Sequence, residues 1–350
     1  MVSVFFWTIP LLFVLVVRTI LYVLFLLPAF VRFVWYYCVA SDRRVFTYKK
    51  DSIRNKLDVY GAVTEEENNN NTKPVLIYFP GGAWLIGSKM WGAFLARTLV
   101  PFGVLVIIVD YRNYPFGNVP DMIQDVEDAL NWSKQECARF RGDPKRMVAL
   151  GQSAGGHLIS CLLLRRDMGH EQQSPSSFSL RDDLCGIVTL SSPYDISAVW
   201  SFFAKKGMDP DWAAQKLFVG RPSDYDPLHL LESTDVSALL KKLPPMMIMH
   251  GTGDSVVPHG GSVAFVNALR GNMTEAQQQH VQYKLYDHWS HTDPILESLM
   301  EGDHRCHKDL MELLQKWTNH NVAFDDTRPH CGRMLPQWCI QAARYASAFQ

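Results

Sequence analysis

The stretch Val148-Ala149-Leu150-Gly151-Gln152-Ser153-Ala154-Gly155-Gly156-His157-Leu158 determines how the rest of the chain is interpreted. An apolar run typical of a strand leads into it, and a helix-compatible run from His157 to Arg166 follows. Gly-x-Ser-x-Gly between a strand and a helix predicts a sharp turn that exposes the serine hydroxyl. The glycines leave room for that turn, and the helix N-terminus behind it offers free N–H groups and partial positive charge. We therefore expect Ser153 to be a nucleophile, with a purely structural turn as the alternative.

A second glycine-rich loop follows another apolar run. Val75 to Phe79 predicts a buried strand, and it leads into Pro80-Gly81-Gly82-Ala83-Trp84. Such a loop aims backbone N–H groups at the negative oxygen that develops during acyl transfer. We expect an oxyanion hole formed by Gly81, Gly82, Ala83 and Ala154. The N–H donors in it are expected to come from Gly82, Ala83 and Ala154. Because Pro80 stands where such loops normally carry histidine, other contacts must hold this loop; a turn without catalytic role is the alternative.

Two later loops contain candidates for the acid and the base. The strand-like run Met246 to His250 leads to Asp254, which is where the acid of a Ser, Asp, His order belongs. The last strand-like run is followed by His288 and His291, and His304 comes later. We choose His291 as the base because it lies deeper in the loop and precedes Thr-Asp. His288 and His304 are expected to be surface histidines, and His157 a packing or capping residue.

Length, composition and cysteine usage exclude several classes of protein. The 350 residues suffice for one large domain with an appendage. A net charge of -1 argues against a nucleic-acid surface. The seven cysteines are scattered without a CxxC pair, which favours reduced, mostly buried thiols over a disulfide framework. We expect no metal or organic cofactor, and a zinc site at His288, His291 and Asp293 is disfavoured because the serine and aspartate already account for that loop.

The N-terminal 37 residues are intensely apolar, which predicts membrane attachment. They form either one long tilted span that contains Arg18 or two short segments in a hairpin. A cleaved signal peptide fits poorly, because no basic residue precedes the run and no small-x-small site follows it. Six basic residues follow the segment and favour a catalytic domain in the cytosol: Arg43, Arg44, Lys49, Lys50, Arg54 and Lys56. Three glycosylation sequons point to the lumen instead, but such triplets often arise by chance: Asn70, Asn131 and Asn272.

The remaining pattern predicts an α/β fold with a mostly parallel central sheet, helices on both faces and a small cap. We expect a membrane anchor at 1–40, a catalytic domain at 41–320 and a tail at 321–350 that packs on the domain or contacts the membrane surface. The aromatic-rich segment at about 197–245 is expected to form a lid over an apolar acyl or prenyl pocket. Trp84 to Val100 is predicted to be a helix, and Asp110 and Arg112 are predicted to pair.

The motifs together resemble the prenylcysteine (isoprenylcysteine α-carbonyl) methylesterases, which are hormone-sensitive-lipase-like α/β-hydrolases. The resemblance runs from about Val75 to Asp309 and rests on five motifs and their order: Gly-Gly-Ala-Trp, Asp-Tyr-Arg-Asn, Gly-Gln-Ser-Ala-Gly, His-Gly-x-x-Asp and Ser-His-Thr-Asp. It is supported by Trp84 to Trp91 and by Gly142 to Arg146. The resemblance implies an α/β-hydrolase fold with Ser153 as nucleophile, Asp254 as acid and His291 as base. The chain departs from the family's pattern at Pro80, where the histidine is absent.

The resemblance also implies a reaction and a place in the cell. The expected reaction is cleavage of the methyl ester on a prenylated C-terminal cysteine through an acyl-enzyme. The substrates would be prenylated protein C-termini or small apolar methyl esters at the endoplasmic reticulum or Golgi membrane. The alternatives are a general membrane carboxylesterase or lipid deacetylase, and a catalytically inert fold that serves as a binding scaffold.

Overall fold

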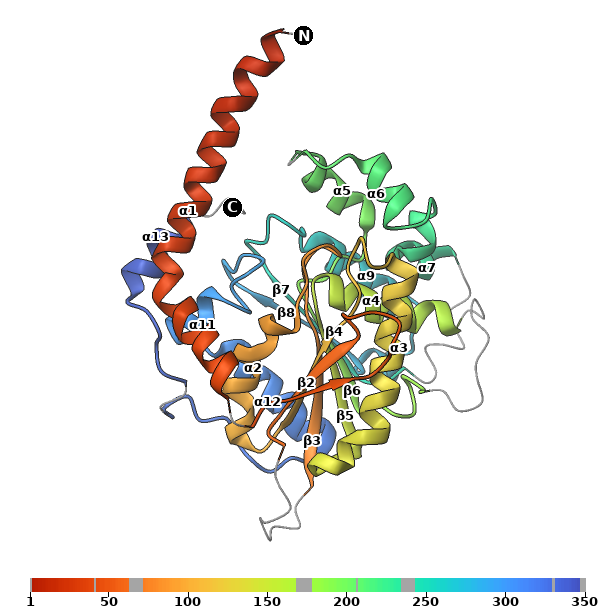
Figure 1. Ribbon diagram of the computed structural model, residues 1–350. Coiled ribbons are helices and arrows are strands. Elements are labelled where there is room, and N and C mark those ends of the chain that lie inside the picture. Colours follow the sequence, from red (N-terminus) through yellow and green to blue (C-terminus); the bar gives the residue numbers. More distant parts are fainter. Residues whose placement is uncertain are drawn as a thin grey trace.

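An eight-stranded sheet crosses the protein, and helices cover both of its faces (Figure 1). The computed structural model describes residues 2–40, 42–62, 72–167, 178–205, 207–233, 243–328 and 331–346. The strands lie in the order β1-β2-β4-β3-β5-β6-β7-β8. Strand β2 pairs antiparallel with both of its neighbours, β1 and β4, and all other neighbouring strands pair in parallel. Their bounds are β1 Arg44–Thr47, β2 Lys56–Tyr60, β3 Lys73–Phe79, β4 Leu105–Asp110, β5 Gly142–Gln152, β6 Gly186–Leu190, β7 Met246–Gly251 and β8 Val281–Tyr286. The expected mostly parallel sheet is confirmed.

The apolar runs of the central strands are buried because both faces of the sheet are covered. Alternate side chains of β3 point to opposite layers: Val75, Ile77 and Phe79 to one core, Leu76 and Tyr78 to the other. The first core lies beneath α3 (Val119–Glu136), α4 (Ala154–Asp167) and α9 (Gly260–Gly271). The second lies beneath α1 (Val2–Val39), α2 (Ala93–Leu99), α12 (Arg305–Thr318) and α13 (Gln337–Ala346).

In its described residues, the segment between β6 and β7 holds three short helices on one side of the sheet (Figure 1). They are α5 (Ile196–Lys205), α6 (Pro210–Lys216) and α7 (Pro227–Ser233), with a 3-10 turn at Pro222–Tyr225. Other short helices are α10 (Glu275–Gln278), α11 (Glu297–Glu301) and 3-10 turns at Lys89–Gly92, Val100–Phe102 and Cys137–Phe140. All seven cysteines are free, and five of them are buried.

Two expectations about local structure are wrong. Trp84 to Val100 is not one helix, because Ser88 caps a 3-10 turn at Lys89–Gly92 and α2 begins only at Ala93. Asp110 and Arg112 do not pair with each other. Asp110 lies 2.8 Å from Arg54 and Arg112 lies 2.8 Å from Asp125, since the chain turns after β4 and sends the two side chains to different neighbours.

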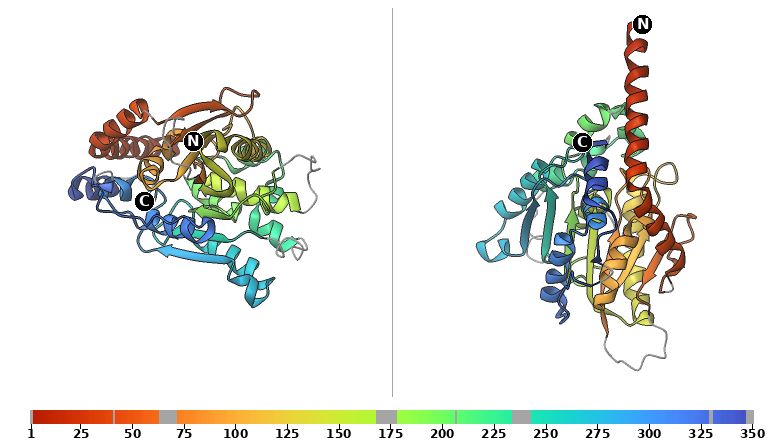
Figure 2. Two further views of the ribbon diagram at one scale, coloured as in Figure 1. Left: turned by 90° about the horizontal axis from the view of Figure 1, so that it is seen from below. Right: turned by 90° about the vertical axis from the view of Figure 1, so that its left-hand side faces the viewer.

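The N-terminal apolar segment forms one helix rather than a hairpin. Helix α1 has 38 residues, which corresponds to a length of about 57 Å. Its N-terminal part extends away from the catalytic domain, and its C-terminal half lies against the domain (Figure 2). Val17–Val39 is long and apolar enough to cross a membrane by length and composition. Helix α13 of the C-terminal tail packs along α1.

Candidate active site

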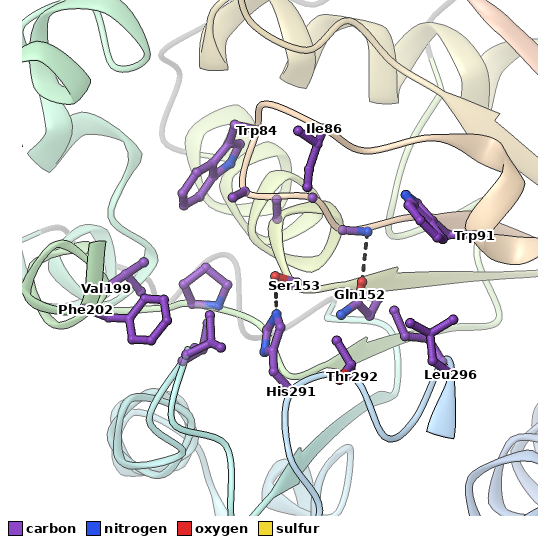
Figure 3. Close-up of a pocket in the computed structure, with 18 of the residues that line it drawn as sticks. Trp84, Ile86, Trp91, Gln152, Ser153, Val199, Phe202, His291, Thr292 and Leu296 are labelled. Atoms are coloured by element: carbon purple, nitrogen blue, oxygen red, sulfur yellow. Dashed lines mark hydrogen bonds between the residues drawn. The ribbon is translucent and has the colours of Figure 1, made fainter. Parts of the chain in front are cut away.

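The turn between β5 and α4 places Ser153 at the carboxyl edge of the sheet, as the sequence predicts. Ser153 has a φ of 51°, the strained left-handed conformation of a nucleophile elbow. A side chain at Gly155 would lie 2.1 Å from the carbonyl oxygen of Phe79, so only glycine allows β3 and the elbow to approach so closely. The Ser153 hydroxyl donates to His291 Nε2 at 2.9 Å (Figure 3).

The acid lies directly behind this histidine. His291 Nδ1 donates to Asp254 Oδ2 at 2.8 Å, so Ser153, His291 and Asp254 form one continuous hydrogen-bonded chain. Asp254 Oδ1 accepts from the backbone N–H groups of Val256 (3.0 Å) and Val257 (2.9 Å). Burial opposes ionisation of Asp254, but the charge of His291 and hydrogen bonds from two histidines hold its pKa well below the usual range. The carboxylate is therefore ionised and can orient and stabilise a His291 imidazolium.

His250 is a site residue to which the sequence analysis assigns no role. It is fully buried, and its Nε2 lies 3.2 Å from Asp254 Oδ2 and 2.8 Å from the Val257 carbonyl oxygen. Both of these atoms are acceptors, so Nε2 carries a proton and supports the carboxylate. Its Nδ1 lies 2.7 Å from the Ser262 hydroxyl, which anchors the ring to α9. The spacing His-Gly-x-x-Asp is the signal that could have identified it.

The oxyanion loop is held without a histidine. Tyr111 donates its hydroxyl to the Pro80 carbonyl oxygen at 2.7 Å, and the Gly81 N–H donates to Gln152 Oε1 at 2.9 Å. Gly81 is therefore engaged in holding the loop and is not a free donor. Gly82 has a φ of 136°, which side chains rarely adopt, and this conformation turns the loop toward Ser153.

Three N–H groups remain as candidate donors for an oxyanion. Within the described residues, no hydrogen bond engages the backbone N–H groups of Gly82, Ala83 or Ala154. All three residues line the cavity that contains the Ser153 hydroxyl. Ala154 is the first residue of α4, so the positive end of that helix adds to the local potential. The sequence analysis names the same three N–H groups as donors, and this role stays a prediction.

His157 joins the oxyanion loop to the cap segment. The Trp84 indole N–H donates to His157 Nδ1 at 3.2 Å, and His157 Nε2 donates to the Tyr225 carbonyl oxygen at 2.7 Å. Burial lowers the pKa of His157 to about 4, so the ring is neutral at pH 7 and serves packing and hydrogen bonding.

Two further histidines, His288 and His304, are expected from the sequence to be surface residues. His288 is exposed as expected. The expectation for His304 is wrong, because it is buried and donates to the Cys331 carbonyl oxygen at 2.7 Å.

An apolar cavity of about 300 Å³ lies over Ser153 (Figure 3). The oxyanion loop and Ile86 form one side, α5 contributes Val199 and Phe202, and the His291 loop contributes Thr292 and Leu296. Such a cavity suits an apolar group attached to a reacting carbonyl. In the part of the chain that the structure describes, no group of three or more His, Cys, Asp or Glu residues could hold a metal ion.

Comparison with known proteins shows the family of this chain. The BD-FAE family model matches residues 57–269. Probable isoprenylcysteine alpha-carbonyl methylesterase ICMEL1 of Oryza sativa subsp. japonica is 30% identical over 338 residues, which cover 94% of this chain and 76% of that protein. Isoprenylcysteine alpha-carbonyl methylesterase ICME of Arabidopsis thaliana is 28% identical over 331 residues, which cover 94% of this chain and 75% of that protein.

Solved structures of esterases share the fold. A thermophilic esterase of Thermogutta terrifontis, Est2, has a TM-score of 0.57 at 22% identity and covers 79% of this chain and 94% of its own. Esterase B of Lactobacillus rhamnosis has a TM-score of 0.61 at 19% identity, and the match covers 80% of this chain and 87% of that esterase. With its BD-FAE domain and its α/β-hydrolase fold, the chain belongs to the isoprenylcysteine α-carbonyl methylesterase family of serine carboxylic ester hydrolases.

Proposed function

We propose that the protein hydrolyses the carboxyl methyl ester of prenylated C-terminal cysteines at a membrane. The observation that carries the proposal is the hydrogen-bonded chain Ser153, His291, Asp254 at the floor of an apolar cavity. A methyl ester has a small leaving group, and its apolar remainder needs such a cavity. The names of the plant relatives support this substrate class over other apolar esters.

The proposed mechanism has two half-reactions. Ser153 Oγ attacks the ester carbonyl carbon while His291 Nε2 takes the hydroxyl proton, and the backbone N–H groups of Gly82, Ala83 and Ala154 stabilise the oxyanion. The tetrahedral intermediate collapses, the carbon–oxygen bond to the methoxy group breaks, and His291 gives its proton to the departing methanol. Water then attacks the acyl-enzyme with His291 again as base, which releases the free acid and restores the Ser153 hydroxyl.

The proposal places α1 in the membrane and the catalytic domain in the cytosol, at the endoplasmic reticulum or Golgi. The support is the apolar helix and the basic residues that follow it, such as Arg43 and Arg44. A substrate held in the cytosolic leaflet by its prenyl chain would then meet the enzyme without leaving that leaflet.

The test is methanol release from farnesyl-cysteine methyl ester by the full chain in detergent or vesicles. Wild type is compared with Ser153→Ala, and a short-chain aryl ester serves as comparison substrate. We expect release that depends on Ser153 and that strongly exceeds aryl ester turnover. Aryl ester turnover without methanol release would instead assign a general membrane carboxylesterase or lipid deacetylase. Retention of most activity in Ser153→Ala would exclude Ser153 as the nucleophile.

A further inference from the structure

Helix α1 contributes directly to the cavity over Ser153. Tyr22 and Phe30 of this helix line that cavity together with the oxyanion loop and α5. The side chains of Leu26, Ala29 and Phe33 between and beside them are buried against the domain. The ring of Phe33 stacks on Phe94 of α2 with centroids 4.5 Å apart. The same helix that is apolar enough to cross a membrane is thus also docked on the domain as a wall of the candidate active site.

A partly buried hydrogen-bond relay runs from α1 to the loop that carries the catalytic histidine. The Tyr22 hydroxyl donates to Glu297 Oε1 at 2.6 Å. The Thr292 hydroxyl donates to the same oxygen at 2.9 Å, and Thr292 is the residue next to His291. Glu297 is only 2% exposed and opens the short helix α11. One carboxyl oxygen therefore joins the membrane helix to the neighbour of the general base.

The tail holds the same loop from its other side. Asp293 accepts from the Ser290 N–H at 2.7 Å and from the Arg344 guanidinium at 2.7 Å. Arg344 lies on α13, which packs along α1. The two residues after His291 are thus linked to two different helices, Thr292 to α1 through Glu297 and Asp293 to α13.

The chemistry of Glu297 indicates how it acts in this relay. Burial, and then the charge of Asp293, raises the pKa of Glu297, which favours the neutral acid. Within the described residues, its second oxygen has no hydrogen-bond partner. The relay therefore depends on Glu297 Oε1 as a hydrogen-bond acceptor. A glutamine side chain has the same shape and an equivalent acceptor oxygen, so it can fill the same role.

We propose that α1 is a working part of the active site. The ring of Tyr22 and the side chain of Phe30 form one wall of the pocket for the apolar group of the ester. The Tyr22 hydroxyl is a positioning group, which acts through Glu297 and Thr292 to set the height and angle of His291 toward Ser153. Undocking of α1 removes the wall and frees the loop, so the domain hydrolyses its ester efficiently only while α1 is docked. This inference rests on the proposed chemistry at Ser153.

The first experiment separates positioning from packing. Tyr22→Phe keeps the ring and removes the hydroxyl, and we expect kcat for a short-chain aryl ester to fall about tenfold with KM within about twofold. Tyr36→Phe, the same change on the same helix but away from the cavity, is the matched control and is expected to match wild type. Glu297→Leu should lose kcat like Tyr22→Phe, and Glu297→Gln should recover most of that loss. Wild-type kcat in Tyr22→Phe, or an equal loss in both Glu297 variants, would overturn the positioning role.

The second experiment tests the wall. Phe30→Ala should raise KM for farnesyl-cysteine methyl ester about tenfold, and much more than it raises KM for the aryl ester. An equal change for the two substrates would overturn the assignment of this wall to the apolar group. Ser153→Ala is measured in parallel. Activity that survives in Ser153→Ala contradicts the proposed function itself, whereas an inactive Ser153→Ala with a fully active Tyr22→Phe contradicts only the role of α1.

Discussion

Asp254 shows how single residues control this site. Its carboxylate accepts from two backbone N–H groups and from two histidine rings, so four donors compensate for its burial. Because these contacts hold its pKa well below the usual range, Asp254 is ionised at pH 7. The contribution of Asp254 to stability is present above its unfolded pKa of about 3.9 and is lost only as pH falls toward the folded value.

Asp254→Asn is predicted to lower kcat by about 10⁴ while the protein stays folded. An asparagine amide in place of the carboxylate favours the tautomer of His291 that puts the proton on Nε2, where it cannot accept the Ser153 proton. Ester turnover measures the loss, and an unchanged circular dichroism spectrum is the control for folding. A loss of less than about tenfold would mean that another group orients His291.

Gln152→Leu is predicted to lower kcat by about 10- to 100-fold. The variant keeps the buried volume but leaves the Gly81 N–H without its acceptor, so the oxyanion loop loses one of the hydrogen bonds that hold it. The loss should be smaller than the 100- to 1000-fold effect of removing an oxyanion donor, because the donors remain. Steady-state kinetics with the aryl ester provides the measurement. Wild-type kcat would show that the remaining contacts, from Tyr111 and His157, hold the loop without Gln152.

At this scale, sequence reasoning can identify neighbouring residues where a residue type lies at a fixed place on a strand or elbow. Ser153, Asp254 and His291 follow from strand ends and chain order, and the structure brings these three together. Gln152 and Tyr111 could not be predicted, because their partners lie across neighbouring strands and loops and no local spacing encodes such contacts.

At the scale of elements, the cap segment is predicted to determine chain-length preference. Phe202 of α5 points into the cavity beside Val199 (Figure 3). Phe202→Ala should raise KM for farnesyl-cysteine methyl ester about tenfold and leave the short aryl ester nearly unaffected, because only the long group reaches this wall. Phe116→Ala is the control, since Phe116 is exposed and does not line the cavity. Equal effects of Phe202→Ala on both substrates would remove α5 from the pocket.

The central strands β3, β4, β6 and β7 could be predicted because they are parallel and buried on both faces, which requires continuous apolar runs. Helix beginnings were harder to predict. Asn118 caps α3 through a reciprocal hydrogen bond with Asp121, which defines the start of this helix at Val119. The predicted helix from Trp84 fails because Trp84 itself has a φ of 62° and its indole is held by His157. Tertiary contacts of the oxyanion loop override the local propensity there.

At the scale of the whole molecule, α1 has two apolar faces with different partners. One face packs on the domain through residues such as Leu26 and Phe33. Away from these contacts, ten of the described large apolar side chains of α1 are more than 40% exposed, which favours contact with lipid: Val14, Ile20, Leu21, Val23, Leu24, Leu27, Val31, Val34, Trp35 and Val39. The sequence could not separate the two faces, because lipid and a protein core select the same apolar residues.

Buried neutral histidines are predicted to make the whole fold sensitive to acid. The pKa of His157 falls from 6.5 to about 4 on burial, so between these values the unfolded chain binds a proton that the folded protein does not. The stability contributed by the neutral ring is complete above pH 6.5 and is lost as pH falls toward 4, by about 2 kcal/mol at pH 5. His157→Gln can still donate to the Tyr225 carbonyl oxygen but cannot titrate. The free energy of unfolding should therefore drop less between pH 7 and pH 5 in His157→Gln than in wild type.

The exposure of one glycosylation sequon provides a test of the membrane topology. Asn272 lies on the surface at the end of α9, whereas Asn131 is half-buried within α3 and Asn70 lies outside the described residues. A lumenal domain would therefore present Asn272 to the glycosylation machinery, while a cytosolic domain would not. We predict that the protein from eukaryotic cells shows no change in mobility after deglycosylation. A positive control carries an added sequon ahead of α1, which must be glycosylated if α1 crosses the membrane with the domain in the cytosol. A mobility change that Asn272→Gln abolishes would place the domain in the lumen, and a prenylated cytosolic substrate would then be out of reach.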